Sequence, residues 1–87
     1  MIKVVLVDDQ TLVRQGVKSL LSLAESIEVV AEASDGQHAI ELIPTIKPDV
    51  VLMDMRTPVK SGLDAIQELA ALKALPPTII LTTFDDD

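Results

Sequence analysis

Acidic and hydroxyl side chains follow three separate apolar runs in this sequence. Asp8 and Asp9 stand side by side directly after "VVLV", and Asp54 follows "VVLM". Thr82 and Thr83 follow a third run, "TIIL". Oxygen ligands of this kind are those that hard divalent cations such as Mg²⁺ prefer. The residue types therefore suit a metal site, provided that the fold brings the three chain segments together.

The apolar runs belong to an alternation of predicted strands and helices. Runs rich in β-branched residues and apolar throughout are typical of strands that are covered on both faces. Strands are predicted at residues 2–7, 28–33, 49–54 and 78–83, and helices at 11–24, from about 35 onward, and at 61–75. The order β-α-β-α-β-α-β predicts an α/β fold built on a parallel sheet.

Local signals support the three helices. The first has one apolar face, since its apolar residues recur at helical spacing: Val13, Val17, Leu20, Leu21 and Ala24. Ser34 with Gln37, and Ser61 with Asp64, have the spacing of a capping box. Pro44 is expected to end or kink the second helix.

The predicted sheet gives the acidic residues a common location. In open parallel sheets the ligand crevice lies beyond the carboxyl ends of the strands, where Asp8, Asp9 and Asp54 fall together with the two threonines. If the first and third strands are neighbours, each pair of carboxylates at about 4 Å costs on the order of 4 kcal/mol at an effective dielectric constant near 20. A bound Mg²⁺ would offset that repulsion, because it is held by one or two carboxylates and keeps several waters.

Composition excludes several other classes of protein. The 87 residues are enough for one domain, and a net charge of −7 argues against a nucleic-acid surface on this segment. No apolar run is long enough for a membrane span, the start is not a signal peptide, and the absence of cysteine removes thiol chemistry. Three scattered glycines make neither a P-loop nor a dinucleotide fingerprint. His38 is expected on a solvated helix face, and Asp9 or Asp54 taken singly could be a helix or turn cap.

Three motifs together resemble a known family. The segments "VVLVDDQTLVRQG", "VVLMDMRTPVKSGLDAI" and "TIILTTFDDD" are similar to the receiver domain of bacterial two-component response regulators of the NarL/LuxR type. The resemblance implies a flavodoxin-like, doubly wound parallel sheet in which the first strand lies between the second and third. It also implies that Asp54 is the phosphoacceptor and that Mg²⁺ (or Mn²⁺) is bound by Asp8, Asp9, Asp54 and the backbone carbonyl of Arg56. Thr82 would be the switch hydroxyl that closes on the phosphoryl group.

The resemblance further implies a cytoplasmic signalling switch and not a turnover enzyme, although such domains can catalyse their own phosphorylation and dephosphorylation. A sensor histidine kinase would supply the phosphoryl group, and the receiver would control a transcriptional regulator. Residues 1–87 are then expected to be a receiver domain that is incomplete at its C-terminus, without the usual last helix-strand-helix and its catalytic lysine. Contact with DNA would come only through a C-terminal helix-turn-helix domain of the intact protein.

Two departures and two alternatives complete this interpretation. Position 57 is Thr where the family usually has Met, a local change beside Pro58. A phosphatase that uses Asp54 as nucleophile would need a second aspartate at position 56, where this chain has Arg. The remaining alternative is a receiver-fold module that is not phosphorylated and serves for pairing. Because residues 78–81 would form an uncovered sheet edge, a homo-oligomer or a dimer with exchanged elements is expected.

Overall fold

A four-stranded parallel sheet forms the centre of the computed structural model, which describes residues 1–55, 57 and 59–81. The elements follow in the order β1 (Ile2–Val7), α1 (Thr11–Leu21), β2 (Ile27–Ala33), α2 (Gly36–Ile46), β3 (Val50–Asp54), α3 (Gly62–Ala71) and β4 (Thr78–Leu81). The strand order is β2-β1-β3-β4, and every neighbouring pair is parallel. The predicted α/β, flavodoxin-like fold and its strand order are therefore confirmed.

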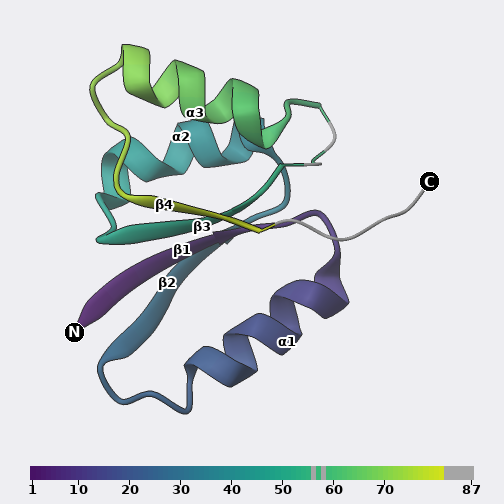
Figure 1. Ribbon diagram of the computed structural model, residues 1–87, viewed down its shortest axis with the longest axis vertical. Helices are drawn as coiled ribbons and strands as arrows, with labels where there is room; N and C mark the ends of the chain where they lie inside the picture. The colour runs from purple at the N-terminus through teal and green to yellow at the C-terminus, as the bar shows by residue number, and fades with distance from the viewer. Residues whose placement is uncertain (56, 58, 82–87) are drawn as a thin grey trace.

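The helices cover the two faces of the sheet unequally. Figure 1 shows α1 on one side of the sheet and α2 and α3 together on the other. The main core lies on the side with two helices. Each of these helices buries a glycine, an alanine three residues later and a large aliphatic residue four residues after that. The buried members of the core are Val5, Val7, Ala33, Ala39, Ile43, Val51, Met53, Ala65 and Leu69. Among the described residues, none of the helices has the length and apolar character needed to cross a lipid bilayer.

The first helix is shorter and less buried than predicted. It ends at Leu21 and not at Ala24, because the amides of Leu23 and Ala24 donate to carbonyls three residues back and tighten the chain into a turn. None of its residues is fully buried, and Leu20, predicted on the apolar face, is 70% exposed. A single helix covers this face of the sheet, so side chains on its flank remain open to solvent.

The start of the second helix also corrects the prediction. Its N-cap is Asp35 and not Ser34, since the Asp35 carboxylate accepts a 2.8 Å hydrogen bond from the amide of His38. Pro44 lies inside the helix and does not end it; the helix continues to Ile46 and stops where Lys47 adopts a left-handed conformation. The proline has no amide hydrogen to donate to the carbonyl of Ile40, but the helix continues past it for two residues.

The third helix begins as its capping signal predicts and packs directly against the backbone of Asp54. The Ser61 hydroxyl accepts a 3.1 Å hydrogen bond from the amide of Asp64. A Cβ atom added to Gly62 would lie 2.6 Å from the carbonyl oxygen of Asp54. Only glycine allows this approach, so the position of α3 and the position of Asp54 depend on each other.

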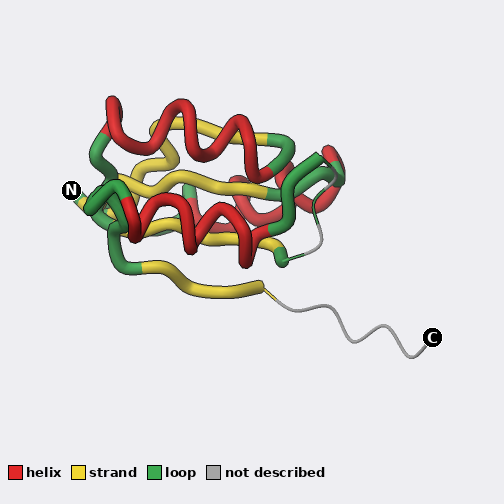
Figure 2. The backbone as a smooth tube through the Cα atoms, turned by 90° about the horizontal axis from the view of Figure 1, so that it is seen from above, coloured by secondary structure: helices red, strands yellow, loops and turns green. Residues whose placement is uncertain are grey.

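The strand β4 forms one edge of the sheet and is incompletely covered. It pairs with β3, and its side chains Ile79 and Ile80 are 55% and 46% exposed. Figure 2 shows this strand running along one side of the molecule. By strand alternation, Ile79 shares a face with its register partner Leu52, opposite the core formed with α2 and α3. No helix within the described residues lies over this part of the sheet.

Replacing Gly62 by Ala is expected to lower the free energy of unfolding by about 1–3 kcal/mol, because the new methyl group would force the chain away from Asp54. Urea unfolding followed by circular dichroism measures the change. Gly16→Ala is the control: nothing lies within 4 Å of its added Cβ, and glycine within a helix is unfavourable. That variant should be more stable by about 1 kcal/mol. Equal stability of the wild type and Gly62→Ala would contradict the proposed close packing.

An 87-residue polypeptide of this sequence is expected to self-associate through β4 and its uncovered apolar face. Ile79→Lys should shift the population toward monomer with little loss of stability, because Ile79 is already more than half exposed. Light scattering after size-exclusion chromatography reports the mass. Leu12→Lys on α1, where Leu12 is 82% exposed, should leave the association unchanged. A monodisperse wild-type monomer would show this prediction to be wrong.

Candidate functional site

Three carboxylates converge at the carboxyl edge of the sheet. Asp8 and Asp9 follow β1, Asp54 ends β3, and the two strands are paired in register with Val7 beside Met53. One carboxylate oxygen from each aspartate lies within 4.8 Å of the other two. Asp8 and Asp54 are buried, with 4% and 8% of their surface exposed, and Asp9 is exposed. The predicted meeting of these residues at one edge is confirmed.

Local hydrogen bonds orient Asp8 within this group. Its amide donates to the carbonyl of Ala33 on β2 at 3.0 Å, and its carboxylate oxygen Oδ1 accepts from the amide of Gln10 at 2.8 Å. The N-cap of α1 is Gln10, whose side chain makes no capping bond. Asp9 is therefore not the side-chain cap of this helix, and its carboxylate instead belongs to the acidic group.

The environment opposes ionisation of Asp8. Burial raises the pKa of the Asp8 carboxyl above its usual value, the hydrogen bond from Gln10 lowers it, and the charges of Asp54 and Asp9 raise it again. The Arg14 guanidinium has a smaller lowering effect on the same pKa. Because the pKa is raised, this group contributes most to stability below the pKa that it has in the unfolded chain. That contribution is lost as the pH rises through the raised value.

The donor set fits a hard divalent cation. Three carboxylates supply oxygen ligands close together, and two of them are removed from the solvent that would otherwise screen their repulsion. A cation bound among them would offset the effects of burial and of the neighbouring charges of Asp54 and Asp9, which raise the pKa of Asp8. Mg²⁺ and Mn²⁺ both suit such a set of oxygen ligands, with water or phosphate oxygens completing the coordination.

The loop after Asp54 is held by a residue that the sequence interpretation treated as a minor change. Thr57 is buried, and its hydroxyl donates a 2.6 Å hydrogen bond to the carbonyl of Lys60. The same carbonyl accepts from the amide of Gly36 at 3.0 Å, which joins this loop to the start of α2. A hydroxyl in place of the usual Met side chain was the available signal, since a buried hydroxyl needs a hydrogen-bond partner.

Several sequence-predicted positions lie outside the described residues. These are Arg56, whose carbonyl was expected to bind a metal, Thr82, which was expected to be the switch hydroxyl, its neighbour Thr83, and the acidic run at 85–87. His38 is described and is exposed on α2, as predicted. Arg14, which contacts Asp8, was not singled out from the sequence, because its partner Glu32 lies 18 residues away along the chain.

Comparison with known proteins gives consistent matches. The model of the response regulator receiver domain matches residues 4–87. The transcriptional regulatory protein LnrK of Bacillus subtilis is 42% identical over 86 residues, which cover 99% of this chain and 39% of that protein. Among solved structures, the signal receiver domain of NarL from Mycobacterium tuberculosis has a TM-score of 0.89 and 36% identity, covering 98% of this chain and 68% of that one. A LuxR-family two-component response regulator from Aurantimonas sp. SI85-9A1 has a TM-score of 0.90 and 30% identity, covering 98% of this chain and 61% of that one.

The matched region is nearly all of this chain but only part of each relative. The chain spans about two fifths of the length of the curated relatives that it matches. Within this chain, the family model covers nearly every residue. The sequence and the fold of this chain both agree with those of receiver domains. The chain therefore belongs to the receiver domains of two-component response regulators, and its relatives include regulators of the NarL/LuxR type.

Proposed function

We propose that this domain is a phosphorylation-dependent switch in which Asp54 accepts a phosphoryl group from a sensor histidine kinase. Membership of the receiver family supports a role in two-component signalling. The observation that carries the finer proposal is the convergence of Asp8, Asp9 and Asp54 within 4.8 Å at the carboxyl edge of the sheet. In the proposal, Asp8 and Asp9 hold Mg²⁺ or Mn²⁺ beside the acceptor Asp54.

The proposed reaction is a simple displacement at phosphorus. A carboxylate oxygen of Asp54 forms a P–O bond while the P–N bond of the phosphohistidine breaks, and the electron pair stays with the imidazole nitrogen. The bound cation would offset negative charge on the phosphoryl oxygens. The chain itself supplies position: β3 and Gly62 fix Asp54, and the amide of Gln10 orients Asp8. The product remains on the protein, so the domain is a signalling module and not a turnover enzyme.

The wider proposal concerns residues and partners beyond the described site. The backbone carbonyl of Arg56 would add a metal ligand, and Thr82 would close on the phosphoryl group. The intact protein would act in the cytoplasm and bind DNA through a C-terminal helix-turn-helix domain. Support comes from the family match and from relatives such as LnrK, which is a transcriptional regulatory protein.

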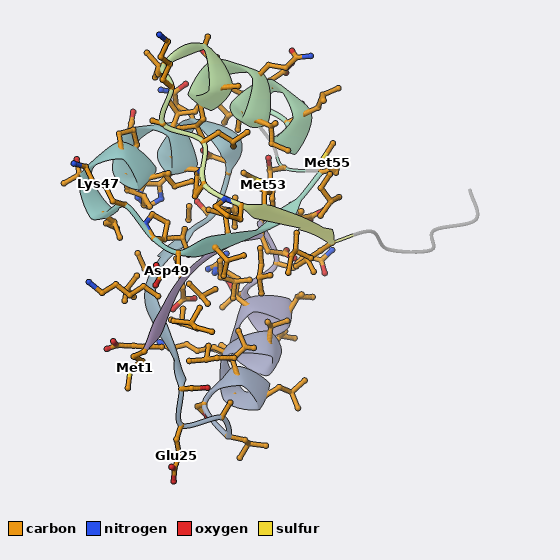
Figure 3. The ribbon with its side chains drawn as sticks, turned by 60° about the vertical axis from the view of Figure 1, so that its left-hand side comes forward. Met1, Glu25, Lys47, Asp49, Met53 and Met55 are labelled. Atoms are coloured by element: carbon orange, nitrogen blue, oxygen red, sulfur yellow. The ribbon has the colours of Figure 1, made fainter. Side chains whose placement is uncertain are left out.

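Asp54 is expected to be the phosphorylated carboxylate. Incubation of the protein with Mg²⁺ and a small acyl phosphate, followed by mass spectrometry, should locate one adduct on Asp54, and Asp54→Ala should abolish it. Asp49→Asn is a matched control, because Asp49 precedes β3 at the end opposite Met55 (Figure 3). Its carboxylate accepts from the amide of Lys3, and asparagine can still do so. Comparable labelling of Asp54→Ala would disprove this assignment; no labelling of any variant would favour the unphosphorylated pairing module.

Divalent metal is expected to stabilise the fold through the acidic group. Binding to the folded state alone adds about 2.7 kcal/mol at a hundredfold excess over Kd. Asp9→Asn should remove most of the Mg²⁺-dependent rise in melting temperature. Asp8→Asn should do the same and also raise the metal-free melting temperature more than Asp9→Asn does, because Asp8 is buried and its ionisation is opposed.

Differential scanning calorimetry with and without Mg²⁺ measures both effects. Glu25→Gln is the control, since Glu25 is an exposed residue before β2, at the other end of that strand from the acidic group (Figure 3). It removes one negative charge and should leave the Mg²⁺ response intact. An unchanged Mg²⁺ response in Asp9→Asn would place the metal elsewhere.

A further inference from the structure

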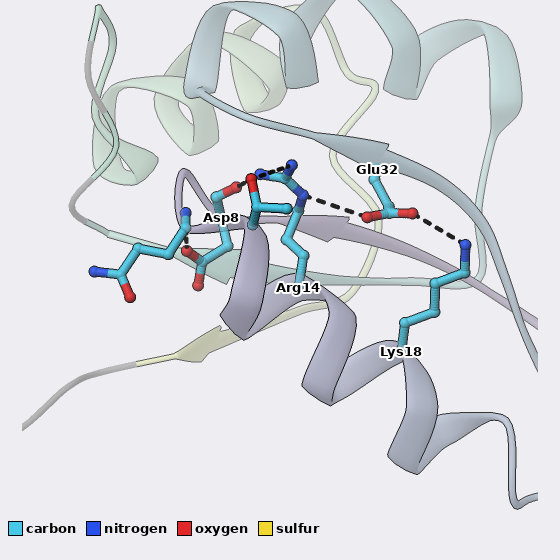
Figure 4. A network of polar contacts seen from close by, with 6 residues as sticks. Asp8, Arg14, Lys18 and Glu32 are labelled. Carbon is cyan, nitrogen blue, oxygen red and sulfur yellow. Dashed lines mark hydrogen bonds and ion pairs between the residues drawn. The ribbon is translucent and has the colours of Figure 1, made fainter.

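Arg14 connects the acidic site to the neighbouring strand. It is the fourth residue of α1, at the end of the first turn, and its guanidinium donates to the backbone carbonyl of Asp8. Its Nε donates to the Glu32 carboxylate on β2 at 3.3 Å, and a third contact reaches the Thr11 hydroxyl at 3.5 Å. Figure 4 shows the guanidinium between Asp8 and Glu32. One side chain therefore joins β1, β2 and α1 at the edge where the carboxylates converge.

Two cationic side chains of α1 contact the Glu32 carboxylate, and they differ in exposure and in their other contacts. Lys18, one turn further along α1, contacts the other carboxylate oxygen of Glu32 at 3.2 Å. The Arg14 side chain is 17% exposed, whereas that of Lys18 is 54% exposed. Both residues are cations that pair with the same acid, but only Arg14 reaches Asp8. Lys18 is therefore a natural control for Arg14.

The carbonyl that accepts a hydrogen bond from Arg14 belongs to the peptide group that joins Asp8 to Asp9. The Asp8 carbonyl lies between the two metal-binding candidates, Asp8 and Asp9, so its orientation helps to set where both carboxylates point. The amide of Arg14 also donates to the carbonyl of Gln10 at 3.0 Å, and the amide of Gln10 donates to the Asp8 carboxylate at 2.8 Å. Backbone and side chain of Arg14 thus secure the same short segment from two directions.

We propose that Arg14, anchored by Glu32, is a positioning residue that holds Asp8 and Asp9 in the geometry that binds the divalent cation. The inference rests on the metal site of the proposed function. Lysine cannot replace arginine in this role, because its single ammonium group lacks the planar fork that reaches a carbonyl and a carboxylate together. Residues that orient metal ligands typically change metal affinity by about 10–100-fold when they are replaced.

If Arg14 acted only through its charge, its removal would change the Mg²⁺ affinity in the opposite direction. The direction of the change therefore tests the proposal. A guanidinium beside the site repels a divalent cation, so removing its charge without disturbing geometry would tighten Mg²⁺ binding. Positioning predicts weaker binding when the fork is lost, whether or not the charge is kept. Arg14→Lys keeps the charge and loses the fork, and Arg14→Gln loses both.

The first measurement is Mg²⁺ affinity of the whole chain by isothermal titration calorimetry. Arg14→Lys and Arg14→Gln should both bind Mg²⁺ about 10-fold more weakly than the wild type. Lys18→Gln removes a cation from the same acid and should bind as the wild type does. Unchanged affinity in Arg14→Lys, or tighter binding in Arg14→Gln, would overturn the proposal.

The second measurement needs no metal and separates this inference from the proposed function. In the metal-free protein, amide hydrogen exchange of Gln10 should be several-fold faster in Arg14→Lys than in the wild type. The amide of His38, which is capped by the Asp35 carboxylate and makes no contact with Arg14, should be unaffected. Unchanged exchange at Gln10 would overturn the role of Arg14 even if Mg²⁺ binds. A wild type that binds no Mg²⁺ would refute the proposed metal site and, with it, the role of Arg14 in metal binding.

If Arg14→Lys does not fold, Glu32→Gln gives the same test with Arg14 in place. Glutamine keeps the shape of Glu32 but loses the charge that anchors the guanidinium. Mg²⁺ affinity and protection of the Gln10 amide should then fall in the same direction as for Arg14→Lys, by a smaller factor. Wild-type values for both in a folded Glu32→Gln variant would overturn the proposal.

Discussion

The burial of carboxylates beside one another, together with their mutual repulsion, is the constraint on which the site depends. Asp8 and Asp54 are buried beside each other, with Asp9 close by, and the raised pKa of Asp8 records the cost of ionising it there. An uncharged side chain of similar shape at position 8 would avoid this cost. The arrangement is retained at a cost to stability, which is typical of sites that bind a cation.

The parallel sheet makes this arrangement possible. Parallel strands place their carboxyl ends at one edge, so residues far apart in sequence meet there without a dedicated loop. The strand β1 lies at the centre, between β2 and β3, and carries Asp8 and Asp9 between its two neighbours. Gly62 then fits α3 against the carbonyl of Asp54, which fixes Asp54 from the other side. The site is therefore positioned by elements that the hydrophobic core already stabilises.

The two faces of the sheet are covered through different kinds of interaction. The face with α2 and α3 holds the main core, while the face with α1 has no fully buried helix residue. On that second face, α1 is joined to β2 by the ion pairs of Arg14 and Lys18 with Glu32. A helix held by few buried contacts depends more on polar ties, and one of these ties also reaches the acidic site. Packing on this face is thereby coupled to the geometry of Asp8.

The sequence by itself determined the element order, the strand positions, the acidic group and the family. Continuous apolar strands, a capping serine at Ser61 and acids after two strands are local signals that need no knowledge of distant contacts. The cap at Asp35 and the early end of α1 rest on hydrogen bonds between residues three apart, which the sequence signals did not single out. Tertiary structure alone decided the exposure of Leu20. It also decided the contact of Arg14 with Asp8 and Glu32, because that contact depends on how β1, β2 and α1 meet in space. Spacing along the chain carries no record of a pairing between elements.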